Sequence, residues 1–174
     1  MSRSAVVILL TCTALAACDQ NSEAVVASPR EPDSHATGYY CRMTLSEHPG
    51  PKGQLLLKGS ADPLWFSSVR DALTYVDQDL TNESEIAGFW VNDMAQGTWE
   101  KPAPGSWIGA TSAWYVLGSG KTAAMGGGEA VPFKERAQAE AFVREFGGST
   151  GDYSAARREV AKALAGGVES GGGL

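Results

Sequence analysis

The stretch of sequence that decides the fold is Trp65-Phe-Ser-Ser-Val-Arg-Asp-Ala-Leu-Thr-Tyr-Val76. Its apolar side chains recur with the spacing of one helix face, at Trp65, Val69, Ala72, Leu73 and Val76. This pattern predicts an amphipathic helix that opens at Asp62-Pro63 and runs to about Leu80. The hydroxyl group of Ser67 or Ser68 can cap its start.

The same pattern returns 67 residues later along the chain. The shift superposes apolar and small residues: Phe66 on Phe133, Ala72 on Ala139, Tyr75 on Phe142, Val76 on Val143 and Gly59 on Gly126. Pro132-Phe133 therefore opens a second predicted helix, which Gly147-Gly148 ends after Phe146. Apolar runs bounded by turn residues predict short strands at 54–58, 86–91, 107–117 and 121–131.

From the order of these elements we predict an α+β fold of two ββαβ half-repeats, residues 38–97 and 98–153. The two halves must fold together because each is too small to be stable alone. A short helix at 154–164 closes this domain, which covers residues 38–164. Residues 165–174 are predicted to be disordered because their glycines supply no side chains for packing.

The first eighteen residues are typical of a bacterial lipoprotein signal. Arg3 precedes an apolar run that is too short to span a bilayer, which takes about 20 residues. The run ends in Leu15-Ala-Ala-Cys18, which resembles a lipobox. We predict that residues 1–17 are a signal peptide, that Cys18 carries a lipid anchor, and that the polar residues 18–37 form a flexible tether. The alternative is an ordinary signal peptide with a coincidental cysteine.

Composition excludes several functional classes. The 174 residues include 14 Lys and Arg against 20 Asp and Glu, and the net charge is −6. Such an acidic chain is a poor candidate for nucleic-acid binding, in which phosphate neutralisation supplies most of the affinity. The two histidines, His35 and His48, argue against a His-rich zinc site and against a His-dependent catalytic triad.

The chemistry is concentrated in Cys41-Arg-Met43. Cys12 leaves with the signal peptide and Cys18 carries lipid, so Cys41 remains as a lone thiol in an oxidising compartment. If residues 39–45 form a strand, Cys41 and Met43 point to the same face. Their soft sulfur atoms would select Cu(I) over hard cations. The alternative is a buried cysteine that packs against a core methionine.

Three further side chains can complete a copper site. Met125 precedes Gly126-Gly-Gly128, a loop without side chains to crowd a bound ion. Met94 follows the strand predicted at 86–91, and His48 lies on the turn after Cys41. Each has an alternative role, because methionine is a good core filler and a turn histidine is commonly solvated.

Several blocks of the sequence are similar to the nitrous oxide reductase accessory lipoprotein family, NosL. The blocks are Cys41-Arg-Met43, Glu47-His-Pro-Gly-Pro-Lys-Gly53, Trp65-Phe-Ser-Ser-Val-Arg-Asp71, Val91-Asn-Asp-Met94, Ala113-Trp-Tyr-Val-Leu-Gly-Ser119 and Met125-Gly-Gly through Glu129-Ala-Val-Pro-Phe133. The resemblance runs from the lipobox to about Gly148.

This resemblance implies a lipid-anchored, periplasm-facing Cu(I) chaperone that serves the copper centres of nitrous oxide reductase with its membrane-associated maturation machinery. It also implies an organomercurial-lyase-like fold. Cys41, Met43 and Met125 match the family's sulfur residues, and Met94 and His48 match other conspicuous family positions. A monomer and a metal-bridged dimer both stay open, as do the inner and the outer membrane as the place of the anchor.

Two other functional classes compete with the chaperone. A docking lipoprotein without metal could present an exposed tryptophan, although the five tryptophans are expected mainly in the core. A thiol-dependent lyase is suggested by the fold, but carbon–mercury cleavage calls for more than one thiol and the mature chain keeps only Cys41. We therefore expect no enzymatic activity and assign no catalytic residues.

Overall fold

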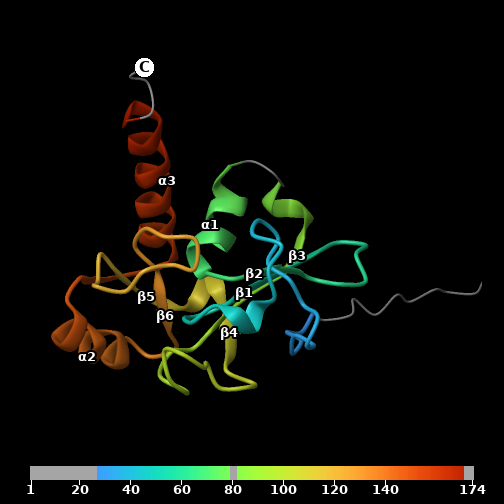
Figure 1. The fold of residues 1–174 in the computed structure, drawn as a ribbon, viewed down its shortest axis with the longest axis horizontal. Coiled ribbons are helices and arrows are strands. Elements are labelled where there is room, and N and C mark those ends of the chain that lie inside the picture. Colours follow the sequence, from blue (N-terminus) through green and yellow to red (C-terminus); the bar gives the residue numbers. More distant parts are fainter. Residues whose placement is uncertain (1–26, 79–81, 171–174) are drawn as a thin grey trace, which may run out of the picture.

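The computed structural model describes residues 27–78 and 82–170 (Figure 1). The first half contains β1 (Gly53–Leu57), β2 (Leu64–Phe66), α1 (Val69–Asp77) and β3 (Ile86–Asn92). After β4 (Trp107–Gly109), the second half contains β5 (Trp114–Leu117), β6 (Val131–Phe133), α2 (Arg136–Phe146) and β7 (Ser149–Gly151). The chain continues into α3 (Tyr153–Ser170), and three 3-10 turns complete the elements: η1 (Leu45–Glu47), η2 (Glu83–Glu85) and η3 (Ala110–Ser112).

Two small antiparallel sheets share one topology. The first sheet has the strand order β2-β1-β3-β4, and the second has the order β6-β5-β7. Each half is therefore a ββαβ unit whose first strand lies in the middle of its sheet, and β4 extends the first sheet beside β3. The predicted α+β class and the two ββαβ half-repeats are confirmed.

The 67-residue shift is visible in the structure. β2 and α1 begin 67 residues before β6 and α2. Phe66 and Phe133, which the shift superposes, are both buried, as are Ala72 and Ala139. The shift therefore relates positions with the same role, an inward residue of the second strand and a small residue on the helix face that packs against the sheet.

Both predicted helices begin later than the sequence pattern indicates. Residues Leu64–Phe66 pair with β1, with Gln54 opposite Trp65, so Trp65 belongs to a strand and not to a helix face. α1 starts at Val69 after the N-cap Ser68, whose hydroxyl accepts a hydrogen bond from the N–H of Asp71 at 3.0 Å. Pairing with a neighbouring strand thus outweighs the helical spacing of a short apolar run.

One predicted strand of the second half is interrupted, and another is wrong. The segment 107–117 is broken by η3, where Tyr115 Oη donates to the carbonyl of the buried Ala110 at 2.7 Å. Because its first part is β4 of the first sheet, the half-repeat boundary at 97/98 is also wrong, and the second unit begins at β5. The segment 121–131 consists mostly of turns, because Gly126 and Gly127 have positive φ angles of 90° and 75° that a strand does not contain.

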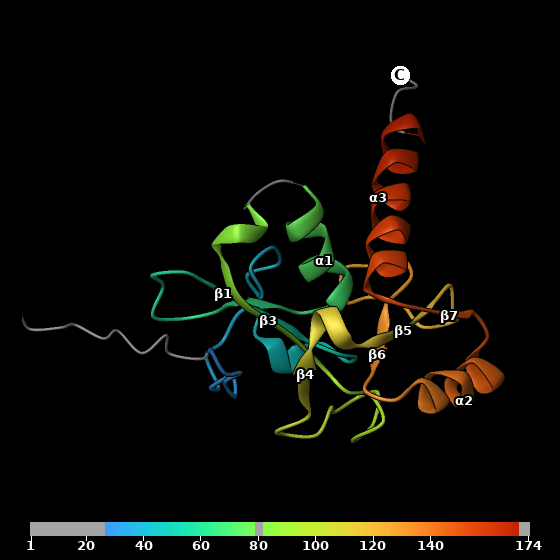
Figure 2. The ribbon, with the colours of Figure 1, turned by 180° about the vertical axis from the view of Figure 1, so that it is seen from behind.

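The C-terminal helix is longer than predicted. α3 continues through Gly166 to Ser170, so residues 165–170 are helical and not disordered, while 171–174 lie outside the described residues. The buried Ala156 and Val160 pack this helix against the main core, which includes α1 and β5. Figures 1 and 2 show α3 rising beside α1, with its C-terminal turns extending beyond the rest of the molecule. A helix anchored at its first turns can therefore carry glycines in its free end.

The segment predicted as a flexible tether is partly folded. The side-chain amide of the fully buried Gln54 accepts from Arg30 N at 2.8 Å and donates to Arg30 O at 2.9 Å. Glu31 accepts from Gly105 N at 2.8 Å and from Trp107 Nε1 at 2.9 Å. The prediction is therefore wrong from Arg30 onward, because a buried amide on β1 requires backbone partners. The predicted signal peptide and Cys18 lie outside the described residues.

The main core lies between α1 and the first sheet and extends to α3 and β5. Gly53 permits this packing, because a Cβ atom there would lie 2.7 Å from the Cβ of Ala72 on α1. All five tryptophans are half-buried, and none is a buried member of this core. Trp99 and Trp114 pack against a second core cluster in the second half, formed by Val116, Val131, Phe133 and Ala139. Within residues 27–78 and 82–170, no helix combines the length and the apolar character needed to cross a bilayer.

Candidate metal centre

Cys41 lies in a tight turn and not in a strand. Gly38 N donates to Met43 O at 2.9 Å, and Arg42 N donates to Gly38 O at 2.9 Å. Arg42 has a φ of 58°, which reverses the chain between Cys41 and Met43. The predicted strand at 39–45 is therefore wrong. Cys41 and Met43 are close together because they share one turn, and not because they point to the same face of a strand.

The thiol of Cys41 lies against the start of α1. Its Sγ is 3.5 Å from Ser67 Oγ and 4.0 Å from Met43 O, and the side chain is half-buried. A Cβ atom on Gly38 would lie 2.7 Å from this sulfur, so a glycine is needed to leave room for it. Cys41 is also the free cysteine of the described part of the chain.

Met125 lies at the tip of a glycine-rich turn. Gly126 N donates to Ala123 O, and Ala123 N donates to Gly127 O, each at 2.9 Å. The Met125 side chain is 58% exposed. It lines a shallow pocket together with Tyr40, the neighbour of Cys41, and with residues of α1. The fold therefore brings the second-half loop of Met125 to the turn that carries Cys41.

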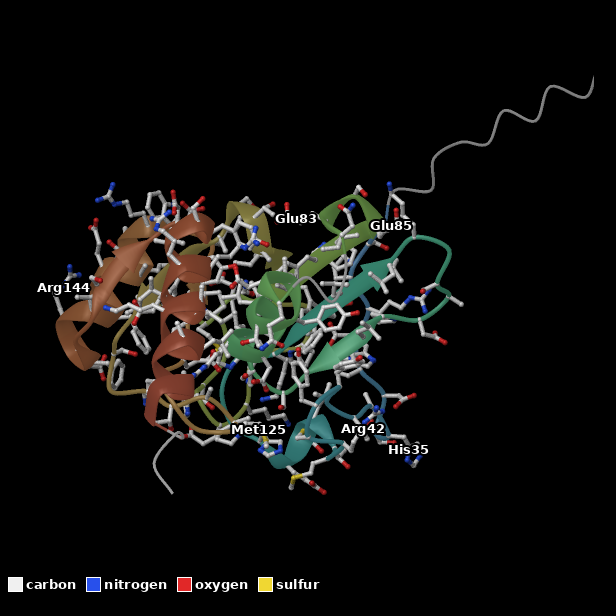
Figure 3. All side chains as sticks on the ribbon, turned by 90° about the horizontal axis from the view of Figure 1, so that it is seen from above. His35, Arg42, Glu83, Glu85, Met125 and Arg144 are labelled. Carbon is white, nitrogen blue, oxygen red and sulfur yellow. The ribbon has the colours of Figure 1, made fainter. Side chains whose placement is uncertain are left out.

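The exposed large apolar side chains of the described residues gather at this one place. They are Tyr40, Met43 and Met125, with exposed fractions of 39%, 46% and 58%. Figure 3 shows Met125 on the same edge of the molecule as Arg42. Burial and the nearby carboxylate of Asp71 raise the pKa of Tyr40 to about 12. The turn therefore carries an exposed thioether, a half-buried thiol and an uncharged phenol, and the exposed thioether of Met125 shares a pocket with that phenol.

His48 lies near the same end of α1. Burial raises the pKa of Asp71, and the charge of His48 is close enough to oppose that shift. His48 Nε2 is buried and has no hydrogen-bond partner among the described residues. A buried imidazole nitrogen without a partner can accept a proton donor or bind a metal ion.

Met94 has a different environment. It packs against the second core cluster with Trp99 and Trp114, and its N–H donates to Pro132 O at 2.9 Å. The contacts found for Met94 in the described part of the chain favour a packing role. In the structure Cys41 and Met43 share one turn, and Met125 lines a pocket with Tyr40 of that turn. His48 lies near Asp71 of α1, whereas Met94 packs against the second core cluster.

A buried lysine supports the turn of His48. Lys52 Nζ donates to the carbonyls of three residues, at 2.8 Å, 3.1 Å and 2.7 Å: His48, Pro49 and Gly50. Burial lowers the pKa of Lys52 from 10.5 to about 8, and electrostatic interactions with Glu129 and Cys41 oppose this shift. A positive charge is therefore held close to the Cys41 turn.

A buried glutamate joins the two halves. Glu129 Oε1 accepts from Arg70 N and from Ala130 N, each at 2.9 Å. Burial raises the pKa of Glu129 from 4.5 to about 8. A carboxyl group of the second half thus satisfies a free N–H group in the first turn of α1.

Comparison with known families places this chain. The family model described as NosL matches residues 29–161. The chain belongs to the NosL family. It is 44% identical over 137 residues to the Copper-binding lipoprotein NosL of Achromobacter cycloclastes, covering 77% of this chain and 69% of that relative. It is 37% identical over 110 residues to the protein of the same name from Stutzerimonas stutzeri, covering 63% of this chain and 56% of that relative.

A solved NosL structure has the same fold. The crystal structure of the copper chaperone NosL from Shewanella denitrificans superposes with a TM-score of 0.67 at 34% identity. The match covers 73% of this chain and 93% of that one. The NosL match begins at residue 29, next to Arg30, where the described chain docks on Gln54.

Sequence reasoning about this NosL chain missed three residues of the candidate site: Lys52, Arg70 and Glu129. Arg70 and Glu129 are 59 residues apart and meet only in the folded chain. A lysine, an arginine and a glutamate in an acidic chain are expected on the surface. No signal in a single sequence separates them from solvated charges.

The donor set is unusual for a hard or a zinc-binding centre. Among residues 27–78 and 82–170, no three His, Cys, Asp or Glu side chains are grouped to hold a metal ion. The candidate centre consists of one thiol, two thioethers and a nearby imidazole. Thiolate and thioether sulfur are the ligands that soft Cu(I) prefers.

Proposed function

We propose that this protein carries Cu(I) at the Cys41 turn and delivers it for the assembly of the copper centres of nitrous oxide reductase. The observation that carries the proposal is that Met43 shares the turn of the Cys41 thiol and that the exposed Met125 lines a pocket with Tyr40 of this turn. Relatives named as copper-binding lipoproteins and a copper chaperone support it. The acceptor rests on the family resemblance.

In this proposal the Cys41 thiolate is the principal ligand. Met43 and Met125 donate thioether sulfur, and the free Nε2 of His48 is available as a nitrogen ligand. Met94 is the weakest candidate because it packs in the second core. The site acts without chemistry on a substrate, so no residue has a catalytic role.

The exposure of the thioethers suits copper transfer. A site with two or three ligands at the surface leaves one side of the ion open to an incoming ligand of the acceptor. A weak thioether ligand can leave as the new bond forms, so the ion is never released free. A fully enclosed four-ligand site would lack this open position.

The lipid anchor on Cys18 would keep the carrier on the periplasmic face of a membrane. Eleven residues separate Cys18 from the docked Arg30. Fully extended, they span at most about 40 Å. We expect Cys18→Ala to move the protein from the membrane fraction to the soluble periplasmic fraction, and an unchanged distribution would contradict the anchor.

The test of the function is Cu(I) affinity measured by competition with a chelator, on protein that lacks residues 1–18. We expect Cys41→Ser to weaken binding at least about a hundredfold, at or beyond the range typical of outer-shell changes. Met43→Leu and Met125→Leu should weaken binding less, and Met94→Leu is the matched control. Unchanged affinity in Cys41→Ser would reject the proposal, and absence of stoichiometric copper in the unmodified protein would favour a docking lipoprotein.

A further inference from the structure

We propose that Arg70 is a positioning residue of the copper site, because it fastens the Met125 loop to the end of α1 that contacts Cys41. This inference rests on the proposed Cu(I) function. Arg70 does not touch the ion in this proposal. It sets the distance between two sulfur ligands from different halves of the fold, Cys41 and Met125.

The Met125 loop has little packing of its own. Its tip is Met125 followed by Gly126, Gly127 and Gly128, and a Cβ atom added at Gly126 or Gly128 would meet nothing within 4 Å. Its internal contacts are the backbone hydrogen bonds of Ala123 with Gly126 and Gly127 and a β-bridge between Thr122 and Gly128. Such a loop defines its own shape but does not by itself define its position on the protein.

The guanidinium group of Arg70 supplies that position. Its Nη1 donates to Gly126 O at 3.2 Å. It also lies directly over Gly127, where an added Cβ atom would be 1.5 Å from Nη1 and 2.7 Å from Cζ. A glycine at 127 is thus required for the guanidinium to contact the loop backbone.

The backbone of Arg70 holds the other end of the same segment. Its N–H donates to Glu129 Oε1 at 2.9 Å, and the Glu129 side chain is only 3% exposed. Glu129 N in turn donates to Lys121 O at 3.0 Å, which closes the base of the loop. One residue of α1 therefore binds the loop at its tip and at its base.

The start of α1 also contacts the thiol. Ser67 Oγ is 3.5 Å from Cys41 Sγ and lies three residues before Arg70. Ser68 caps this first turn, and the buried Val69 fixes it in the core. Because this turn is rigid, the Arg70 contacts set where Met125 stands relative to Cys41. In Figure 3, Met125 lies on the edge of the molecule that also carries Arg42.

Releasing the loop should weaken copper binding without removing a ligand. A free loop must be ordered when the ion binds, and the entropy lost in ordering it makes the free energy of binding less favourable. We expect Arg70→Ala to weaken Cu(I) binding by about tenfold, a size typical of coupling within one contact network. Arg144→Ala, which removes an exposed arginine of α2, is the control for the change in charge.

A second variant perturbs the same contact while Arg70 stays in place. Gly127→Ala should displace the guanidinium and give a similar loss of affinity. Gly59→Ala is its matched control, because Gly59 has a φ of 77° against 75° at Gly127 and open space around its Cβ position. Both variants carry the same backbone strain, and only one disturbs Arg70.

The decisive experiment is a double-mutant cycle of Arg70→Ala with Met125→Leu, read by Cu(I) affinity, together with amide exchange of residues 126–128 in metal-free protein. We expect Arg70→Ala to speed this exchange and to cost no further affinity once Met125 is replaced. Additive losses, unchanged exchange, or unchanged affinity in Met125→Leu alone would overturn the positioning role while the Cys41 site stands. Unchanged affinity in Cys41→Ser would instead overturn the proposed function itself.

Discussion

Arg42 holds a backbone conformation that costs free energy. Its φ of 58° lies in the left-handed region, and within the described chain it is the one such residue that is not glycine. A side chain there costs about 1–2 kcal/mol, and strain of this kind is concentrated at functional sites. The strain lies between Cys41 and Met43, so it belongs to the turn that presents the two sulfur atoms.

Replacing Arg42 should separate this strain from the contact of its side chain. The guanidinium lies 5.7 Å from the centre of the Tyr39 ring, and both Arg42→Ala and Arg42→Gly remove that contact. We expect Arg42→Gly to have a free energy of unfolding about 1 kcal/mol higher than Arg42→Ala, because glycine adopts positive φ freely. Urea denaturation measures the difference. Equal stabilities would show that the turn relaxes in solution.

Glu129 should make stability depend on pH. Burial raises its pKa from 4.5 to about 8, so between these values the folded protein keeps a proton that the unfolded chain has lost. Stability contributed by the neutral carboxyl group is therefore present below pH 4.5 and is lost as the pH rises toward 8.

The variant that tests this is Glu129→Gln, which stays neutral and keeps an oxygen for the N–H groups of Arg70 and Ala130. We expect it to unfold with a free energy at least about 1 kcal/mol above the unmodified protein at pH 8, and to lose most of this advantage near pH 5. Denaturation of metal-free protein between pH 5 and 8 measures the slopes. Parallel pH profiles would contradict the buried, neutral state.

Single residues were predictable where their chemistry is rare. Once the predicted signal peptide and the predicted lipid-bearing Cys18 are set aside, one thiol and three methionines remain, and these point to Cys41, Met43 and Met125. The roles of Lys52 and Arg70 were not predictable, because their charges become unusual only when the fold buries them or turns them toward another segment.

At the scale of elements, the repeat makes a comparison of helix starts possible. Ser68 and Glu135 are the N-cap residues of α1 and α2 and are related by the 67-residue shift. Ser68 makes a side-chain cap hydrogen bond, whereas Glu135 makes none. At this equivalent position, the N-terminus of α1 is therefore capped by a side chain and that of α2 is not.

This difference predicts that Ser68→Ala and Glu135→Ser change the free energy of unfolding in opposite directions. Ser68→Ala should lower the free energy of unfolding by about 1 kcal/mol, because the N–H of Asp71 loses its partner. Glu135→Ala should have a smaller effect, and Glu135→Ser should stabilise the protein by up to about 1 kcal/mol. Thermal or urea denaturation of the three variants measures this order. Equal losses from both alanine variants would show that the Ser68 cap contributes nothing.

Elements with a long periodic pattern were predicted well, and short ones were not. The helices around 69–77 and 136–146 were found because apolar residues repeat over several turns. Their starts were misplaced by the apolar residues of β2 and β6, which pair with strands distant in sequence. The sequence does not distinguish the turn at Cys41 from a strand, because the positive φ of Arg42 has no sequence signal.

At the scale of the whole molecule, the N-terminal segment completes the fold. Gln54 is fully buried on β1, and both functions of its amide are satisfied by Arg30. Removing Arg30 would leave a buried donor and a buried acceptor without partners. Within the described part of the chain, Arg30 therefore belongs to the folded unit.

Truncation tests this boundary. Protein lacking residues 1–28 should be as stable as protein lacking residues 1–18. Protein lacking residues 1–35 should lose at least about 2 kcal/mol in free energy of unfolding, since each unsatisfied buried group costs about 1–3 kcal/mol. Gln54→Met should recover part of this loss in the shorter protein only. If the proteins lacking residues 1–28 and 1–35 were equally stable, residues 29–35 would lie outside the folded unit.

The sequence by itself determined the repeated ββαβ plan and the soft-sulfur chemistry, because periodic apolar residues and rare side chains are local properties of a chain. Only the tertiary structure decided that Met125 meets the Cys41 turn, that Met94 packs in a core, and that Arg70 and Glu129 join the two halves. These relations depend on which surfaces of the two units are buried against each other. Burial also changes what a charge does, since Glu129 is held neutral where a solvated glutamate would be ionised.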